Sequence, residues 1–108
     1  MNMNDLRIKK RERMEKISND VYELALKYYR QFGISNETDK QGIKEFIENY
    51  YFSLKIPSSM PNTVALSAVY FVMKKNNDPF LGLKSFNEVF KINPQSIKNC
   101  LEQIIKKE

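Results

Sequence analysis

Amide and lysine side chains in residues 94–105 are the strongest candidates for chemistry in this sequence. Ile97, Leu101 and Ile104 recur at helical spacing after Pro94, so this segment is predicted to be a helix with an inward apolar face. The outward face then carries Gln95, Ser96, Lys98, Asn99 and Glu102. Gln and Asn side chains pair with adenine in the major groove of DNA, and lysine reaches guanine. The face therefore indicates DNA contact, and the alternative is a solvated surface with a Lys98–Glu102 pair.

The residues before this helix predict a helix-turn-helix. Leu83, Phe86 and Phe90 keep helical spacing, and a tight turn at residues 91–93 follows, with Ile92 directed into the core. In such a motif the second helix enters a groove, its N-terminal amides hold a phosphate, and nearby cations contact the DNA backbone. The lysines expected to flank it in this way are Lys84, Lys91, Lys74 and Lys75.

Catalytic chemistry is not indicated. The sequence has no histidine, so the usual base that activates a cysteine or serine is missing. Cys100 falls on the predicted inward face and is expected to be a core residue. The carboxylate pairs Asp20/Glu23 and Glu45/Glu48 have helical spacing, for which a solvated helix face is a better explanation than a metal site. We expect a protein that is not an enzyme and has no catalytic, cofactor or metal site.

Hydrophobic periodicity predicts an all-α domain of five helices, of which the last two form the helix-turn-helix. The expected bounds of the first three are Asp5 to Glu15 through about Phe32, Asn36 or Thr38 to before Pro57, and a Ser59 N-cap to about Lys75. The third is apolar or small almost all round between Val64 and Met73. A helix without a wide polar stripe is buried on most sides, so we expect a bundle around a buried third helix.

Positive charge gathers at both ends of the sequence. The net charge is +5, and residues 1–16 carry six basic and three acidic residues. The basic residues here that are expected to contact phosphate are Arg7, Lys9, Lys10, Arg11 and Arg13. Residues 1–14 are predicted to be either a basic arm or an extension of the first helix, ahead of a single domain at 15–108. The alternative for the whole pattern is a solvated lysine-rich surface.

Length and composition set the class of the protein. At 108 residues it is long enough for one domain with its own core. No apolar run approaches the roughly 20 residues that span a bilayer, and no hydrophobic segment follows the N-terminal charges. One cysteine cannot form an internal disulfide. We expect a soluble intracellular protein, in the cytoplasm of a prokaryotic host or in a nucleus, without membrane contact.

The third helix and the helix-turn-helix share a pattern of residues with a known family. The residues concerned are Val64, Ala65, Ala68, Tyr70, Phe86, Ile92, Ser96, Ile97 and Lys98. They resemble one cyclin-fold repeat of the core of transcription initiation factor IIB and its archaeal counterpart, transcription factor B, over about residues 15–106. The resemblance implies a cyclin-like bundle, and it implies that Gln95 and Lys98 read a promoter element upstream of a TATA box.

The sequence also departs from that family. It lacks the cysteine pairs and histidine of the family's zinc ribbon, and it has room for one repeat rather than two. Gly82 and Ser85 stand where the family has Thr and Glu in the helix-turn-helix. We therefore expect a stand-alone relative with a single repeat.

Two functions are predicted from these observations. The first is a DNA-binding transcription regulator of the initiation factor IIB-like type with one cyclin repeat, whose partner is double-stranded DNA. The second is a protein–protein interaction adaptor that uses the cyclin-like scaffold to hold a basal transcription protein or a polymerase without reading DNA. A second copy of the chain, bound through the N-terminal helix to form a homodimer, is a further expected partner.

Overall fold

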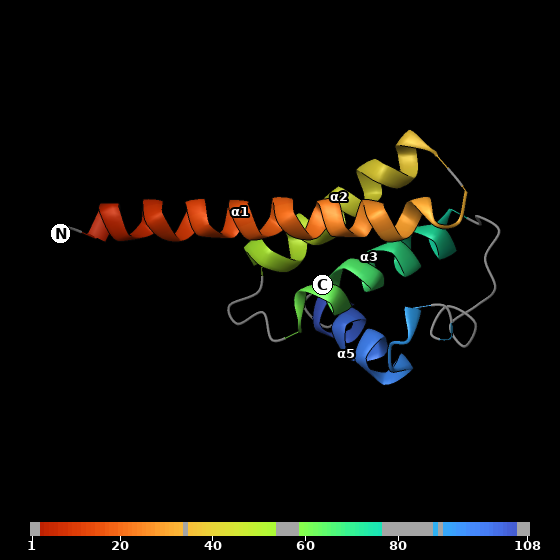
Figure 1. Cartoon of the computed structure of the whole chain (residues 1–108). Coiled ribbons are helices and arrows are strands. Elements are labelled where there is room, and N and C mark those ends of the chain that lie inside the picture. Colours follow the sequence, from red (N-terminus) through yellow and green to blue (C-terminus); the bar gives the residue numbers. More distant parts are fainter. Residues whose placement is uncertain (1–2, 34, 54–58, 77–87, 89, 106–108) are drawn as a thin grey trace.

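The computed structural model describes residues 3–33, 35–53, 59–76, 88 and 90–105. Four helices are present there: α1 (Met3–Arg30), α2 (Glu37–Ser53), α3 (Pro61–Lys75) and α5 (Pro94–Ile105) (Figure 1). No strand occurs within these residues, which confirms the all-α class. In the same part of the chain, no helix has the length and apolar character needed to cross a membrane.

The expected count of five helices is wrong, because the described residues form four. The expected fourth helix, around residues 83–90, falls mostly outside the described residues, although Glu88 and Phe90 are helical. Only about two helical turns fit between Gly82 and Lys91. Apolar spacing over so short a stretch does not distinguish a stable helix from a single turn. A four-helix description therefore replaces the five-helix bundle.

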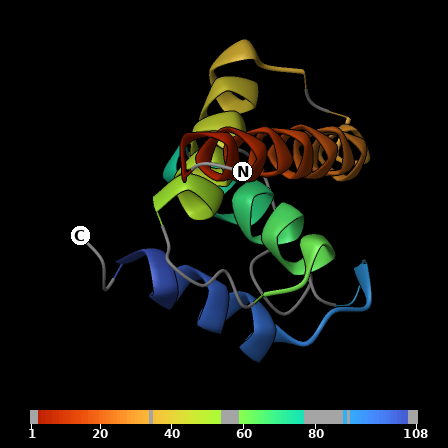
Figure 2. The ribbon, with the colours of Figure 1, turned by 90° about the vertical axis from the view of Figure 1, so that its left-hand side faces the viewer.

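α3 is the centre of the fold, as its sequence predicts. It packs against α1, α2 and α5, and Figure 2 shows it between α1 above and α5 below. Its buried residues are Val64, Ala65, Leu66, Ser67, Ala68, Val69, Val72 and Met73. Each large apolar side chain buried in this way contributes about 1.5–3 kcal/mol. The position of every other helix therefore depends on α3.

Gly42 lets α2 and α3 approach each other closely. A Cβ atom at this position would lie 3.2 Å from Cγ2 of Val72, tighter than most real contacts. Glycine inside a helix costs up to about 1 kcal/mol relative to alanine. The close packing of the two helices explains why a glycine is present at this point of α2.

α1 begins at Met3 and extends beyond the body of the protein. Met14 is the first of its described side chains that packs against the core, and Ser18 is the first that is buried. The turns before Met14 project past the other helices in Figure 1. We call residues 3–13 of α1 the arm; at 1.5 Å per residue it is about 16 Å long. At its other end α1 gives way to a turn closed by Gly33, whose φ of 72° suits glycine.

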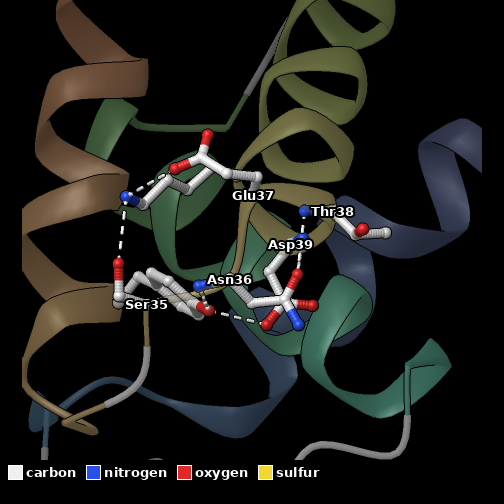
Figure 3. A network of polar contacts seen from close by, with 7 residues as sticks. Ser35, Asn36, Glu37, Thr38 and Asp39 are labelled. Atoms are coloured by element: carbon white, nitrogen blue, oxygen red, sulfur yellow. Dashed lines mark hydrogen bonds and ion pairs between the residues drawn. The ribbon is translucent and has the colours of Figure 1, made fainter.

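A buried polar network joins the ends of α1, α2 and α3. Tyr29 Oη donates to Asp39 Oδ2, and Asn76 Nδ2 donates to Asp39 Oδ1, both at 2.6 Å. Asn36 Oδ1 accepts the backbone N–H groups of Thr38 and Asp39 at 2.8 and 3.4 Å and so caps α2 (Figure 3). The Asn36 N–H itself donates to Tyr29 Oη at 3.2 Å. Asn36 is one of the two helix starts predicted from the sequence.

A second network lies at the other end of α3. Tyr50 Oη donates to Gln103 Oε1 at 3.0 Å and accepts the Ser59 N–H at 2.8 Å. The expected N-cap role of Ser59 is wrong, because Met60 occupies the N-cap and makes no side-chain cap hydrogen bond. Ser59 instead directs its N–H to Tyr50 and its hydroxyl to Gln103, at 3.5 Å. Tyr50 thereby links α2 and α5 to the start of α3.

Candidate nucleic-acid interface

α5 has the two faces that its sequence predicts. Ile97, Cys100 and Ile104 are buried in the core. The outward residues are Gln95, Lys98, Asn99 and Glu102, all exposed, together with the half-buried Ser96. Four of these five, all but Glu102, are the residues predicted to contact DNA, and the structure places them on one side of one helix.

The turn before α5 is anchored to α1 by aromatic packing. The ring centroid of Phe90 lies 5.2 Å from that of Tyr28 and 5.7 Å from that of Phe32. Lys91 has a φ of 54°, the left-handed conformation that reverses the chain, and Ile92 packs against the core. The tight turn predicted here is confirmed, and it fixes the direction in which α5 leaves the body.

Asn93 caps α5 and was not among the predicted site residues. Its Oδ1 accepts the N–H of Gln95 at 2.9 Å, and its backbone oxygen accepts the N–H of Ser96 at 3.0 Å. Pro94 has no N–H to offer. A phosphate at residues 94–96 would therefore have to displace Asn93, which argues against the predicted phosphate contact there. An Asn before a Pro is a recognisable helix start, so the sequence carried this signal.

The two amides on the exposed face of α5 are hydrogen-bonded to each other. Gln95 Nε2 donates to Asn99 Oδ1 at 2.9 Å, a spacing of one helical turn. The bond leaves the Gln95 carbonyl as an acceptor and the Asn99 amino group as a donor at the surface. An acceptor and a donor side by side match the edge of adenine in the major groove.

A polar groove runs along one side of this face. Ser59, Met60 and Thr63 line it from the start of α3, opposite a set of α5 residues. The α5 residues are Ser96, Asn99, Glu102 and Gln103. Met60 is 73% exposed, which is unusual for a large apolar side chain. The sequence placed Met60 next to a helix start but gave no sign that α5 would lie opposite it.

The predicted backbone-contacting lysines do not form one continuous set. Lys91 is exposed at the turn before α5, whereas Lys74 and Lys75 are exposed in the last turn of α3. The ammonium group of Lys74 lies over the ring of Tyr70, 5.8 Å from its centroid. Lys84 lies outside the described residues. On α5 itself Lys98 shares the face with the acidic Glu102, so that helix carries no excess of positive charge.

The arm is the most basic surface in the described part of the chain. Lys9, Lys10, Arg11 and Arg13 are exposed on it, and Arg11 pairs with Glu15 at 3.4 Å. Arg7 belongs to the same stretch of α1, but its side chain is outside what the structure describes. Among the described residues, Lys9, Lys10 and Arg13 form no ion pair.

Three cations of α1 share one face. Lys9, Arg13 and Lys16 are spaced by four and three residues, so they lie in a row, and all three are exposed. Among the described residues, none of the three takes part in an ion pair. We call Lys9, Arg13 and Lys16 the basic stripe. Sequence reasoning identified the first two as site residues but did not include Lys16.

The arm and the exposed face of α5 are separate surfaces. In Figure 1 the first turns of α1 project to the left of the body, whereas α5 lies beneath α3, on the side away from α1. The longest dimension of the described protein is 50 Å. The sequence pointed to both surfaces, but the structure does not bring them together into one site.

Cys100 lies among hydroxyl groups but is buried. Burial raises the pKa of its thiol, and the nearby hydroxyl groups of Ser67 and Ser59 act in the opposite direction without cancelling that rise. The buried Ser67 hydroxyl has no hydrogen-bond partner among the described residues. Burial likewise raises the pKa of the neighbouring Tyr51 to about 12. A thiol that is both buried and neutral is a poor nucleophile.

Comparison with known proteins finds no family model, no curated protein and no solved structure that matches this chain. The resemblance to the repeats of transcription initiation factor IIB therefore stays a prediction from the residues quoted above. In the described residues no group of three or more acidic residues or cysteines is arranged to hold a metal ion. Function must be argued from the two surfaces themselves.

Proposed function

We propose that the protein binds double-stranded DNA and regulates transcription. The basic stripe is the main support for DNA binding. Its three residues, Lys9, Arg13 and Lys16, are exposed in one row and form no ion pairs among the described residues. Exposed cations that form no ion pair are available to bind phosphates and release their counterions. Support for a role in transcription comes from the sequence resemblance.

In this proposal the stripe supplies affinity and α5 supplies sequence preference. The Gln95–Asn99 pair and Lys98 offer donors and an acceptor suited to base edges. Glu102 on the same face repels phosphate, so α5 adds little to binding strength. The basic stripe and the exposed face of α5 are separate surfaces. Contact of α5 with DNA therefore requires a duplex long enough to reach both of them, or a second duplex.

The test is a fluorescence anisotropy titration of labelled 20-base-pair duplexes, one AT-rich and one of random sequence, at several salt concentrations. We expect affinity to fall steeply with salt, with a slope of roughly −0.9 for each phosphate neutralised. Lys98→Glu is expected to weaken binding and to reduce the difference between the two duplexes. Absence of binding at low salt, or affinity that does not change with salt, would refute the proposal.

A second candidate function is that of a protein-binding adaptor, and one observation favours it. A groove between α2 and α3 exposes the ring of Phe71, whose centroid lies 5.4 Å from that of Phe46. Glu37 and Glu45 on α2 and Lys75 on α3 also line this groove. Aromatic side chains in a groove of this kind are common anchors for a partner protein.

The adaptor function is tested with a purified polymerase or basal transcription protein as the partner. Phe71→Ala should abolish binding, whereas Phe52→Ala, which removes another exposed aromatic ring of the protein, should not. Equal binding by both variants, or none by the wild-type protein, would count against an adaptor.

A further inference from the structure

Building on the proposed DNA binding, we propose that the arm binds the duplex as an α-helix inserted in the major groove. In this proposal, contact with the duplex stabilises the helical form of the arm. The charges on the arm, their distribution around the helix and the lack of core packing before Met14 support this mode of binding.

The described side chains of the arm receive little support from the rest of the protein, apart from Arg11, which lines a shallow surface pocket with Glu48 and Phe52 of α2. Residues 9–13 are all exposed, and packing against the core begins only at Met14. An isolated helix of about this length is marginal in water, and the arm, although it continues α1, gains little stability from packing against the core. The arm therefore depends on its own side chains, or on a ligand, to remain helical.

The side chains of the arm oppose a free helix. Lys9 and Arg13 are like charges four residues apart, and Lys10 and Arg13 are like charges three residues apart. Asp5 in the first turn of α1 suits the positive end of the helix dipole, so the opposition to a free helix comes from the like charges that follow it. The Arg11–Glu15 pair is the one ion pair of the described arm, and it is exposed. Phosphate groups would screen the repulsion between these like charges.

The distribution of positive charge around the arm favours binding in a duplex groove over binding on a membrane surface. Lys9 and Arg13 lie on the outer side of α1, while Lys10 and Arg11 follow at about 100° per residue around the helix. A helix about 10–12 Å across fits a major groove about 12 Å wide, where phosphates line both walls. A membrane surface presents charge to one side and requires an apolar face on the other. Cations on several sides favour the groove.

Two substitutions of Glu12 distinguish the effect of helix formation on binding from the effect of charge. Glu12→Ala and Glu12→Pro both remove one negative charge from an exposed position of the arm. Alanine maintains a helix, whereas proline breaks it by clashing with the preceding turn. Proline is tolerated in the first turn of a helix, so α1 can start at residue 12 and keep all its core contacts. Thermal unfolding monitored at 222 nm checks that both variants retain the body.

We expect Glu12→Ala to bind the 20-base-pair duplex at least as tightly as the wild type, and Glu12→Pro to bind roughly tenfold more weakly or worse. Equal affinity of the two variants would overturn groove insertion while leaving DNA binding intact. Failure of both Glu12→Ala and the wild type to bind would instead refute the proposed function. The two failures are thus distinguishable.

Circular dichroism gives a measurement that does not rely on the proline variant. Adding duplex to the wild-type protein at low salt should increase the helical signal at 222 nm, and Glu12→Pro should show a smaller increase. No increase on saturation with duplex would contradict the inference, as would an equal increase with single-stranded DNA. An increase with phosphatidylserine vesicles but not with duplex would assign the arm to membranes instead.

Discussion

The Tyr29 hydroxyl donates a 2.6 Å hydrogen bond to Asp39 Oδ2, and both residues are fully buried. The same hydroxyl accepts the N–H of Asn36, so one side chain holds the end of α1, the start of α2 and a carboxylate that also binds Asn76. Tyr50 repeats this arrangement at the other end of α3. The directions of α1 and α5, and hence of both candidate surfaces, depend on these two tyrosines.

Tyr29→Phe should destabilise the protein by about 1–3 kcal/mol, because it removes a short hydrogen bond to a fully buried carboxyl group. The free energy of unfolding in urea measures the loss. Tyr28→Phe is the matched control, since the Tyr28 hydroxyl bonds to Asn62 in an exposed position at 3.3 Å. We expect the control to cost less than about 0.5 kcal/mol. Equal losses of unfolding free energy in the two variants would show that the Tyr29–Asp39 hydrogen bond contributes no more to stability than the exposed Tyr28–Asn62 bond.

Ala68→Asp should unfold the domain. Ala68 has no exposed surface in the centre of α3, and a charge buried there without a partner costs about 3–5 kcal/mol, comparable with the total stability of a small domain. Asn62→Asp adds the same charge to an exposed position in the first turn of the same helix, where it is favourable. Circular dichroism and thermal unfolding distinguish the two. A folded Ala68→Asp protein would contradict the central position of α3.

Alkaline pH should destabilise the protein through Tyr51. Burial raises the pKa of this hydroxyl from 10.0 to about 12 in the folded state, so the folded protein holds its proton more tightly than the unfolded chain. The stabilisation is fully present below pH 10 and is lost between about pH 10 and 12, amounting to about 2–3 kcal/mol. Tyr51→Phe should lose less stability than the wild type over this range. Parallel losses in both proteins would assign the effect to other groups.

Changing the charge at two neighbouring positions of α5 should alter duplex binding in opposite directions. Lys98→Glu is expected to weaken duplex binding, whereas Glu102→Gln removes a repulsive charge and should strengthen it several-fold. Both side chains are exposed, so stability should change little. Anisotropy titrations at constant salt measure both effects. If neither substitution alters affinity, α5 does not approach the DNA.

Much of the fold was predictable because it rests on periodicity. Val64, Ala68 and Val69 mark α3 as buried on most sides, and Ile97 and Cys100 mark the inner face of α5. The count of helices was wrong because residues 83–90 are too few for apolar spacing to be decisive. These predictions succeeded where many residues repeat one pattern and failed where few do.

The polar networks were not predictable, because they join residues that are distant in sequence. Serine is a typical N-cap residue, yet the Ser59 N–H donates to the Tyr50 hydroxyl and Met60 occupies the N-cap position. Asp39 resembles a favourable acidic residue at the start of a helix until Tyr29 and Asn76 are seen to enclose it. The residues of the candidate site could be predicted from the sequence. That the arm and α5 form separate surfaces could be seen only in the three-dimensional structure.

DNA binding through the basic stripe is tested most directly by the salt dependence of two variants. Arg13→Ala removes a cation from the stripe, and Lys27→Ala removes an exposed cation of the same helix that lies on the body. Lys27 follows Lys9 by about five helical turns and so faces the same way. We predict that Arg13→Ala weakens duplex binding and reduces the slope of log affinity against log salt by about 1, while Lys27→Ala changes neither. Identical slopes for the wild type and Arg13→Ala would contradict the proposed role of the stripe.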